Sequence, residues 1–334
     1  MIFDEIIGQE KAINRLKGYI DTRTVDGAFL FTGPAGVGKA LCARSFAKAL
    51  NCLSPDAHGC NECASCRKID KDAHPDIHVI DSCAAGEPAD EEANQIKIAQ
   101  IRQLQEDIGY RPYEGRKKVF IINNAHQMNL EAANAFLKTL EEPPSDSVII
   151  LITDRRALLL PTVVSRCRIV KFYPLSRSRL EEALTAGAVD GTRCSQQEAH
   201  FLAYFSEGSL GTALRLRERR VFEEKNRVID LFCGSARPAG DPVPAVSRQE
   251  LLSSFNILAS WFRDIYMLKT GAGPQELIHA DRRDELAANA RRYSFDDLDR
   301  IFGLISESAL NVERNVNKKL LVSNMIAGCR LGPA

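Results

Sequence analysis

Short apolar runs alternate with amphipathic segments over the first half of the chain. The runs predict buried β-strands at residues 28–32, 76–81, 117–125, 147–153 and 167–174. Apolar residues recur every three or four positions between the runs, which predicts helices at about 39–50, 98–110 and 129–142. Because each strand is an almost continuous apolar run, both faces of the sheet must be covered. This order predicts an α/β domain with a parallel five-stranded sheet.

After Pro174 the pattern is helical only. Residues 176–184, 195–205 and 209–219 predict a small helical bundle, and a long helix is expected at about 218–232. A loop rich in glycine and proline follows at 234–247, before further helical spacing from Leu251 and a long, helical and amphipathic segment over 295–328. We therefore expect three domains, at 1–172, 173–217 and 218–334.

Composition narrows the class of protein. The 334 residues include 44 Lys plus Arg and 44 Asp plus Glu, so the formal net charge is zero and a strongly basic nucleic-acid binder is not indicated. The first residues lack the features of a secretory signal, and no apolar run is long enough to cross a membrane. Ten cysteines without an export signal favour a reducing, cytoplasmic environment and metal binding over disulfides.

The sequence GPAGVGKA follows the first predicted strand and opens a predicted helix. It matches the phosphate-binding pattern G-x-x-x-x-G-K-[S/T] except at its last position. Backbone N–H groups of such a loop surround phosphate, and the lysine reaches the β- and γ-phosphates. The predicted nucleotide-binding residues are Gly33, Pro34, Ala35, Gly36, Val37, Gly38, Lys39 and Ala40.

Two groups that hydrolysis needs are missing. Ala40 has no hydroxyl to bind Mg²⁺, and the strand that ends at Asn123 and Asn124 has amides where a carboxylate is required. Loss of a general base alone lowers a rate by about 10²–10⁴-fold. We expect any ATP or ADP bound here to be held without turnover. Asp154 and Glu142 are the nearest alternative candidates for a base and a metal ligand.

Four cysteines form a cluster with the spacing C-x7-C-x2-C-x2-C. Cys52, Cys60, Cys63 and Cys66 supply the four thiolates that a closed, structural Zn²⁺ site requires. An iron–sulfur cluster is the alternative, although no further Cys followed by Pro comes after Cys66. His58, His74 and His78 are spare candidate ligands, each better interpreted as a surface or packing residue.

Several stretches together resemble the bacterial clamp-loader AAA+ subunits of DNA polymerase III. They are FDEIIGQEKA, GPAGVGKA with the cysteines behind it, IRQLQEDIGYRPYEGRKKVFII, NAFLKTLEEPP and LPTVVSRC, which together cover about residues 1–215. The resemblance implies an AAA+ domain with a zinc module at 52–66, a helical lid and a C-terminal collar domain. That family has gamma/tau motor subunits and a delta-prime branch that usually does not hydrolyse ATP.

The departures from the motor pattern favour the delta-prime branch. Motor subunits carry Ser or Thr at position 40, Asp-Glu at 123–124 and a sensor arginine where this chain has Gly211. The resemblance implies that Arg166 acts as an arginine finger in trans, on ATP held by a gamma/tau neighbour. It also implies a delta subunit, a sliding clamp and primed DNA as further partners. The chain would then be a subunit of a DNA polymerase holoenzyme without ATPase activity of its own.

Two other functions stay open on the sequence. One is an ATP-hydrolysing gamma/tau-type motor, which would need a replacement base and metal ligand. The other is a zinc-ribbon protein that binds nucleic acid and uses the α/β domain as a scaffold. Zero net charge and the lack of a clear aromatic and basic cluster count against the second.

Overall fold

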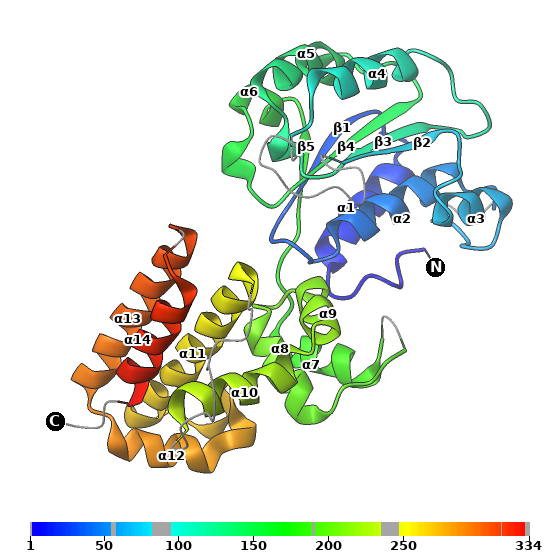
Figure 1. Ribbon diagram of the computed structural model, residues 1–334. Coiled ribbons are helices and arrows are strands. Elements are labelled where there is room, and N and C mark those ends of the chain that lie inside the picture. The colour runs from blue at the N-terminus through cyan, green and yellow to red at the C-terminus, as the bar shows by residue number, and fades with distance from the viewer. Residues whose placement is uncertain are drawn as a thin grey trace. The chain divides into compact units, whose positions relative to one another are not determined.

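The computed structural model describes residues 2–54, 58–81, 95–188, 191–234, 247–314 and 316–330 (Figure 1). Contacts within the chain divide it into two units. The first is Met1–Ala183 with Gly208–Thr212, and the second is Leu184–Glu207 with Ala213–Ala334. The division into three domains at residues 172 and 217 stays a prediction.

The first unit is built on a five-stranded sheet. Its strands are β1 (Gly27–Thr32), β2 (Ile77–Ile80), β3 (Lys118–Ile122), β4 (Ser147–Thr153) and β5 (Arg168–Lys171). They pair in the order β2-β3-β4-β1-β5, and every pair is parallel. The predicted parallel α/β fold is confirmed, and the expected strands overlap all five. The observed β3 stops before Asn123, which leaves both asparagines beyond the strand end.

Helices cover both faces of this sheet, as Figure 1 shows. Helices α1 (Glu10–Asp21) and α2 (Lys39–Asn51) pack on one face, and α4 (Ile98–Ile108), α5 (Leu130–Glu141) and α6 (Pro161–Val164) pack on the other. The unit also contains α3 (Ala64–Asp70), most of α7 (Arg177–Ala186) and the short 3-10 turns η1 (Ala125–Gln127) and η2 (Arg156–Leu158). Side chains alternate between the faces of a strand. Phe29 therefore packs with Phe46 of α2, whereas Leu30 joins the core around Phe136 of α5.

A buried carboxylate fixes the loop before β3. Asp76 is fully buried and accepts hydrogen bonds from the backbone N–H groups of Tyr113, Glu114 and Gly115, at 2.6, 2.9 and 2.7 Å. Burial raises the pKa of Asp76, but these donors outweigh it and hold that pKa below its usual range. Glu114 also pairs with Lys68 of α3 at 2.6 Å, so the loop links the sheet to the cysteine module.

The second unit is helical. It contains most of α9 (Leu210–Glu218), with α8 (Gln196–Phe205), α10 (Val221–Cys233), α11 (Arg248–Lys269), η3 (Pro274–Glu276), η4 (Ala280–Arg282), α12 (Arg283–Arg292), α13 (Phe295–Glu313) and α14 (Lys318–Arg330). Helix α11 lies against α10, α12 and α13 and buries Phe255, Trp261 and Phe262. Lys225 is fully buried, and its Nζ lies 2.5 Å from Asp281 Oδ1. This ion pair satisfies a charge that would be costly to bury alone.

The structure divides two helical regions at points that the sequence pattern did not locate. The helix expected at 218–232 begins only at Val221, because Arg220 has a left-handed backbone (φ 54°) that separates α9 from α10. The segment over 295–328 is helical as expected, and it consists of two helices, α13 and α14. Asn317 starts α14, where its side chain accepts a hydrogen bond from the Lys319 N–H, as N-cap residues do.

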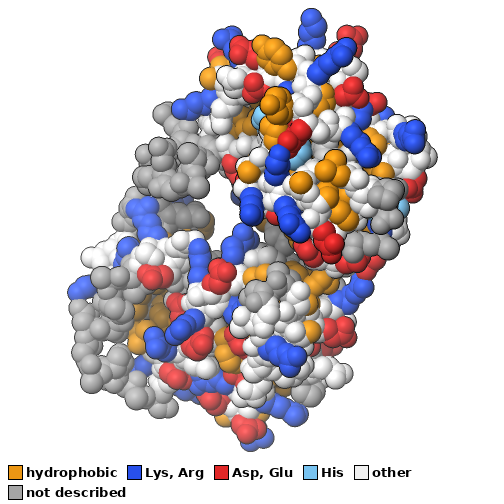
Figure 2. Space-filling model, turned by 90° about the vertical axis from the view of Figure 1, so that its right-hand side faces the viewer, with side chains coloured by type: hydrophobic (Ala, Val, Ile, Leu, Met, Phe, Trp, Pro, Cys, Tyr) orange, Lys and Arg blue, Asp and Glu red, His pale blue; other side chains and the backbone are white. Residues whose placement is uncertain are grey.

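Two surface properties bear on function. Among the described residues, none of the helices combines the length and apolar character needed to cross a membrane. On the face drawn in Figure 2, Lys and Arg side chains are interspersed with Asp and Glu rather than gathered into one basic area. This distribution agrees with the balanced charge of the sequence.

Candidate functional site

The glycine-rich loop lies at the carboxyl edge of the sheet, between β1 and α2. Gly33, Gly36 and Gly38 have φ values of 152°, 73° and 95°, in the region that favours glycine. A Cβ on Gly33 would lie 2.4 Å from the Phe172 carbonyl oxygen. The predicted strand–loop–helix order is therefore present, with the loop glycines where the backbone needs them.

Lys39 is folded into the loop that it ends. Its side chain is buried, and Nζ donates hydrogen bonds to the carbonyl oxygens of Gly33 at 2.7 Å and Pro34 at 2.5 Å. Burial lowers the pKa of Lys39, and the nearby charge of Asp154 opposes that shift. The ammonium group thus lies within the loop, where phosphate oxygens could replace the two carbonyls. Val37 is buried in the core, whereas Pro34, Ala35 and Ala40 are exposed.

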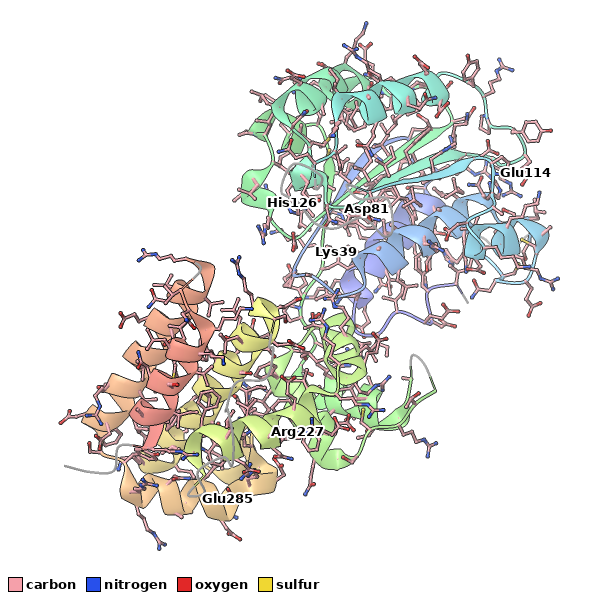
Figure 3. All side chains as sticks on the ribbon, in the orientation of Figure 1. Lys39, Asp81, Glu114, His126, Arg227 and Glu285 are labelled. Carbon is pink, nitrogen blue, oxygen red and sulfur yellow. The ribbon has the colours of Figure 1, made fainter. Side chains whose placement is uncertain are left out.

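The asparagines that follow β3 contact an acidic residue that the sequence did not reveal as part of the site. Asn123 and Asn124 each donate a side-chain N–H to Asp81, at 3.2 and 3.3 Å. Figure 3 labels Asp81 together with Lys39 and His126 at this edge of the sheet. Asp81 follows β2, the parallel neighbour of β3, so the two strand ends meet at one edge. The run DIHVID contained the signal, since its last Asp closes a predicted strand.

A second polar group lies at the ends of β3 and β4. His126 Nδ1 is 3.1 Å from Thr153 Oγ1 and 3.5 Å from Asp154 Oδ1. Burial lowers the pKa of His126, and Asp154 opposes this. Asp154 is also one of the two alternative bases considered from the sequence. Burial lowers the pKa of Lys39 and the negative charge of Asp154 opposes that shift, so Asp154 acts on the loop electrostatically. Glu142 follows α5 and shares no described contact with Lys39.

The segment 208–212 packs directly on the loop, within the same unit. The Gly211 N–H donates to the Gly36 carbonyl oxygen at 2.8 Å, and Ser209 Oγ donates to the Ala35 carbonyl oxygen at 2.7 Å. A Cβ on Gly211 would lie 2.8 Å from that Gly36 oxygen and 3.0 Å from its Cα. The space beside Gly211, where the resemblance would lead one to expect a sensor arginine, is therefore filled by backbone contact.

Restoring an arginine at this position should not restore hydrolysis. Gly211→Arg forces a side chain against the Gly36 backbone, and overpacking of this kind costs about 1–3 kcal/mol. We expect a lower urea midpoint and no ATPase activity. Gly303→Arg is the matched control, because Gly303 lies in α13 with open space around its Cβ position. Unchanged stability of Gly211→Arg together with new ATP turnover would contradict this expectation.

The four clustered cysteines converge on one point. Cys52, Cys60, Cys63 and Cys66 place their sulfur atoms within 4.8 Å of one another. Tetrahedral Zn²⁺ with sulfur ligands at about 2.3 Å requires sulfur–sulfur distances of about 3.8 Å. The Sγ atom of Cys52 lies 3.4 Å from that of Cys60 and 3.9 Å from that of Cys63. The four residues could therefore hold one metal ion with little rearrangement.

Backbone N–H groups prepare this cluster for thiolates. Cys60 Sγ accepts from the N–H groups of Glu62 and Cys63, and Cys63 Sγ accepts from that of Cys66. Burial opposes ionisation of Cys63, yet hydrogen bonds led by the Cys66 N–H lower its pKa to about 6. Burial raises the pKa of Cys66. A cation is the natural way to stabilise all four sulfur atoms as thiolates.

The three spare histidines make their described contacts with residues other than the four clustered cysteines. His58 Nε2 is 3.0 Å from Asp21 Oδ1, and His74 Nδ1 accepts the Asp76 N–H at 3.1 Å. His78 stacks on the Phe120 ring. Packing and surface roles, as the sequence suggested, account for all three.

Arg166 lies just after α6, on the first unit. Its Nη2 is 3.3 Å from Glu141 Oε2, at the end of α5, and its Nη1 donates to the Thr162 carbonyl oxygen at 3.1 Å. The arginine side chain is about one-third exposed. The guanidinium group is thus anchored but remains accessible to a second molecule.

Two family profiles match the chain. One, described as DNA polymerase III, delta subunit, matches residues 8–176, about half of the chain. The other, described as the C-terminal part of the DNA polymerase III delta subunit, matches residues 239–329. Together they span both the α/β unit and the later helices.

Curated relatives agree with these profiles. DNA polymerase III subunit delta' of Bacillus subtilis is 27% identical over 329 residues, 95% of each chain. Subunit delta' of Pseudomonas aeruginosa is 35% identical over 204 residues, which are 61% of this chain and 59% of that protein. Subunit tau of Bacillus subtilis is 31% identical over 222 residues, 66% of this chain but only 38% of tau.

A gamma-subunit-related protein of Thermotoga maritima aligns over 96% of this chain and 98% of its own, with 18% identity and a TM-score of 0.46. That score is too low to support an argument on function. The profile that covers half of the sequence decides the assignment, and the delta' relatives support it along most of the chain. The chain belongs to the DNA polymerase III delta-subunit family of bacterial clamp-loader proteins, as a delta-prime-type member.

Proposed function

We propose that this chain is a non-hydrolysing delta-prime-type subunit of a clamp loader. It sits beside a gamma/tau subunit and donates Arg166 in trans to the ATP held there, with a delta subunit in the same assembly. Through the complex it takes part in placing a sliding clamp on primed DNA. The regions 1–172, 173–217 and 218–334 serve as its AAA+ domain, helical lid and collar domain.

One observation carries the proposal: the loop keeps its glycines and Lys39, while other residues stand where the groups for cleavage are expected. Lys39 lies in the loop, but Asn123 and Asn124 donate hydrogen bonds to Asp81 where a metal ligand and a base are needed. The Gly36–Gly211 contact further occupies the place of a sensor arginine. ATP or ADP bound here is a structural ligand without turnover.

The cysteine cluster serves a structural purpose in this proposal. The four sulfur atoms hold one Zn²⁺, with no position left for water or substrate. Cys52 and Cys66 pack with Ile2 in a small apolar cluster, so the ion joins the start of the chain to α2 and α3. The zinc-ribbon alternative receives no support from the interspersed charges in Figure 2.

The gamma/tau-type alternative keeps one supporting observation. Asp81 and Asp154 supply carboxylates at the carboxyl edge of the sheet, and Asp154 acts on Lys39. The two proposals differ in what the isolated chain does with ATP.

The purified chain alone should release no phosphate from ATP above background. Adding a gamma/tau homologue should form a complex on size exclusion, and ATP turnover by the mixture should exceed that of the homologue alone. Turnover by the isolated chain at about 1 s⁻¹ or faster, lost in Lys39→Ala, would instead identify a motor subunit. A mixture that neither associates nor gains activity would also reject the proposal.

A further inference from the structure

The surroundings of Arg166 suggest a role for a second residue. Both Nε and Nη2 of Arg166 donate to one oxygen of Glu141, Oε2, at 3.4 and 3.3 Å. On the other side, Nη1 donates to the Thr162 carbonyl oxygen at 3.1 Å. All three nitrogen atoms of the guanidinium group therefore donate hydrogen bonds, two of them to the Glu141 carboxylate and one to the Thr162 carbonyl oxygen.

These contacts leave part of the guanidinium available. An arginine side chain has five N–H donors, and the described hydrogen bonds use three. One N–H remains on Nη1 and one on Nη2. Two N–H groups on neighbouring nitrogens form the fork that binds two phosphate oxygens. The arrangement orients the arginine without consuming its phosphate-binding capacity.

The two acceptors belong to rigid parts of the α/β unit. Glu141 is the last residue of α5, whose Phe136 and Leu140 are buried against the sheet. Thr162 is in α6, which starts with Pro161 and buries Val163. Helices α5 and α6 also contact each other. The hydrogen bonds to Glu141 and Thr162 hold the long Arg166 side chain, which would otherwise sample many rotamers, against helices that pack on the core.

We propose that Glu141 is a positioning residue for Arg166: together with the Thr162 carbonyl it orients the arginine toward the phosphate of a nucleotide on a neighbouring subunit. This inference rests on the proposed trans role of Arg166. Glu141 itself is exposed and touches no nucleotide; it acts only through the arginine. Its contribution is modest, because an exposed ion pair changes the population of a side-chain orientation by at most about fivefold.

The test uses the complex reconstituted with a gamma/tau homologue. Glu141→Ala should lower kcat for ATP about two- to fivefold and leave KM unchanged, because nucleotide binding on the neighbour is untouched. Glu141→Gln keeps an acceptor oxygen without the charge, and it should restore most of the loss. Glu142→Ala is the matched control, since this exposed neighbour has no described ion pair. Melting temperatures of all variants should agree.

A double variant separates this inference from the proposed function. If Glu141 acts through Arg166, Glu141→Ala should have no further effect in the Arg166→Ala background. Should Arg166→Ala itself leave turnover unchanged, the trans role fails. Should Arg166→Ala lower turnover while Glu141→Ala equals or exceeds the wild type, only the positioning role is wrong. An equal loss in Glu142→Ala would likewise overturn it.

Discussion

Arg166→Ala should lower ATP hydrolysis at the neighbouring site by about 10³-fold, the lower range for an arginine finger. The guanidinium stays charged at any physiological pH and binds two oxygens at once, so alanine removes both charge and fork. Because the Arg166–Glu141 pair is partly exposed, its loss should change the free energy of unfolding by less than about 1 kcal/mol. ATP binding to the complex should persist.

The measurement is single-turnover hydrolysis by a complex in which only the site facing this chain is competent. Arg166→Lys should recover only part of the rate, because an ammonium group keeps the charge but not the fork. Arg156→Ala removes the same charge from an exposed residue of η2 and is the control. Wild-type turnover in Arg166→Ala would remove the main functional proposal.

Loss of the proposed zinc ion should have the second large effect. Structural zinc contributes about 10–16 kcal/mol of apparent binding free energy in small zinc-finger peptides. Cys66 is fully buried, so Cys66→Ser should abolish binding and leave a polar group in an apolar cluster with Ile2. We expect about one zinc per wild-type chain, none in the variant, and a stability loss of several kcal/mol.

Elemental analysis and urea unfolding measure the two effects together. Cys42→Ala is the control, because Cys42 is buried in α2 away from the four clustered sulfur atoms. It should lose some packing energy and keep its zinc. Iron with visible absorbance in the wild-type chain would show that the cluster is of the iron–sulfur kind. A metal-free wild type of unchanged stability would reject a metal site altogether.

Much of the fold could be predicted from local pattern. The apolar runs at 147–153 and 28–32 overlap β4 and β1 because buried parallel strands leave little room for polar residues. Local sequence also predicts the shape of the phosphate loop, through its glycines, and the convergence of Cys60, Cys63 and Cys66, through their spacing. In each case the determining interactions are short in sequence.

Other features depend on residues far apart in the chain. The sequence around Gly211 gives no sign that this residue lies against Gly36. The sequence around Asp81 likewise does not predict its contacts with Asn123 and Asn124. The break between α9 and α10 falls at Arg220, a residue type that rarely adopts a left-handed backbone. Tertiary packing decided these positions, and helical spacing alone could not locate the break.

The contact between Gly36 and Gly211 also limits how this chain could change. A hydroxyl at position 40 needs one substitution at an exposed residue, whereas a carboxylate at position 123 would face the Asp81 carboxylate that Asn123 now contacts. No side chain fits at position 211 unless segment 208–212 first moves off the loop. If the chain does not hydrolyse ATP, as we propose, an arginine at position 211 would first have to displace this segment, so a stepwise change toward hydrolysis passes through a less stable intermediate.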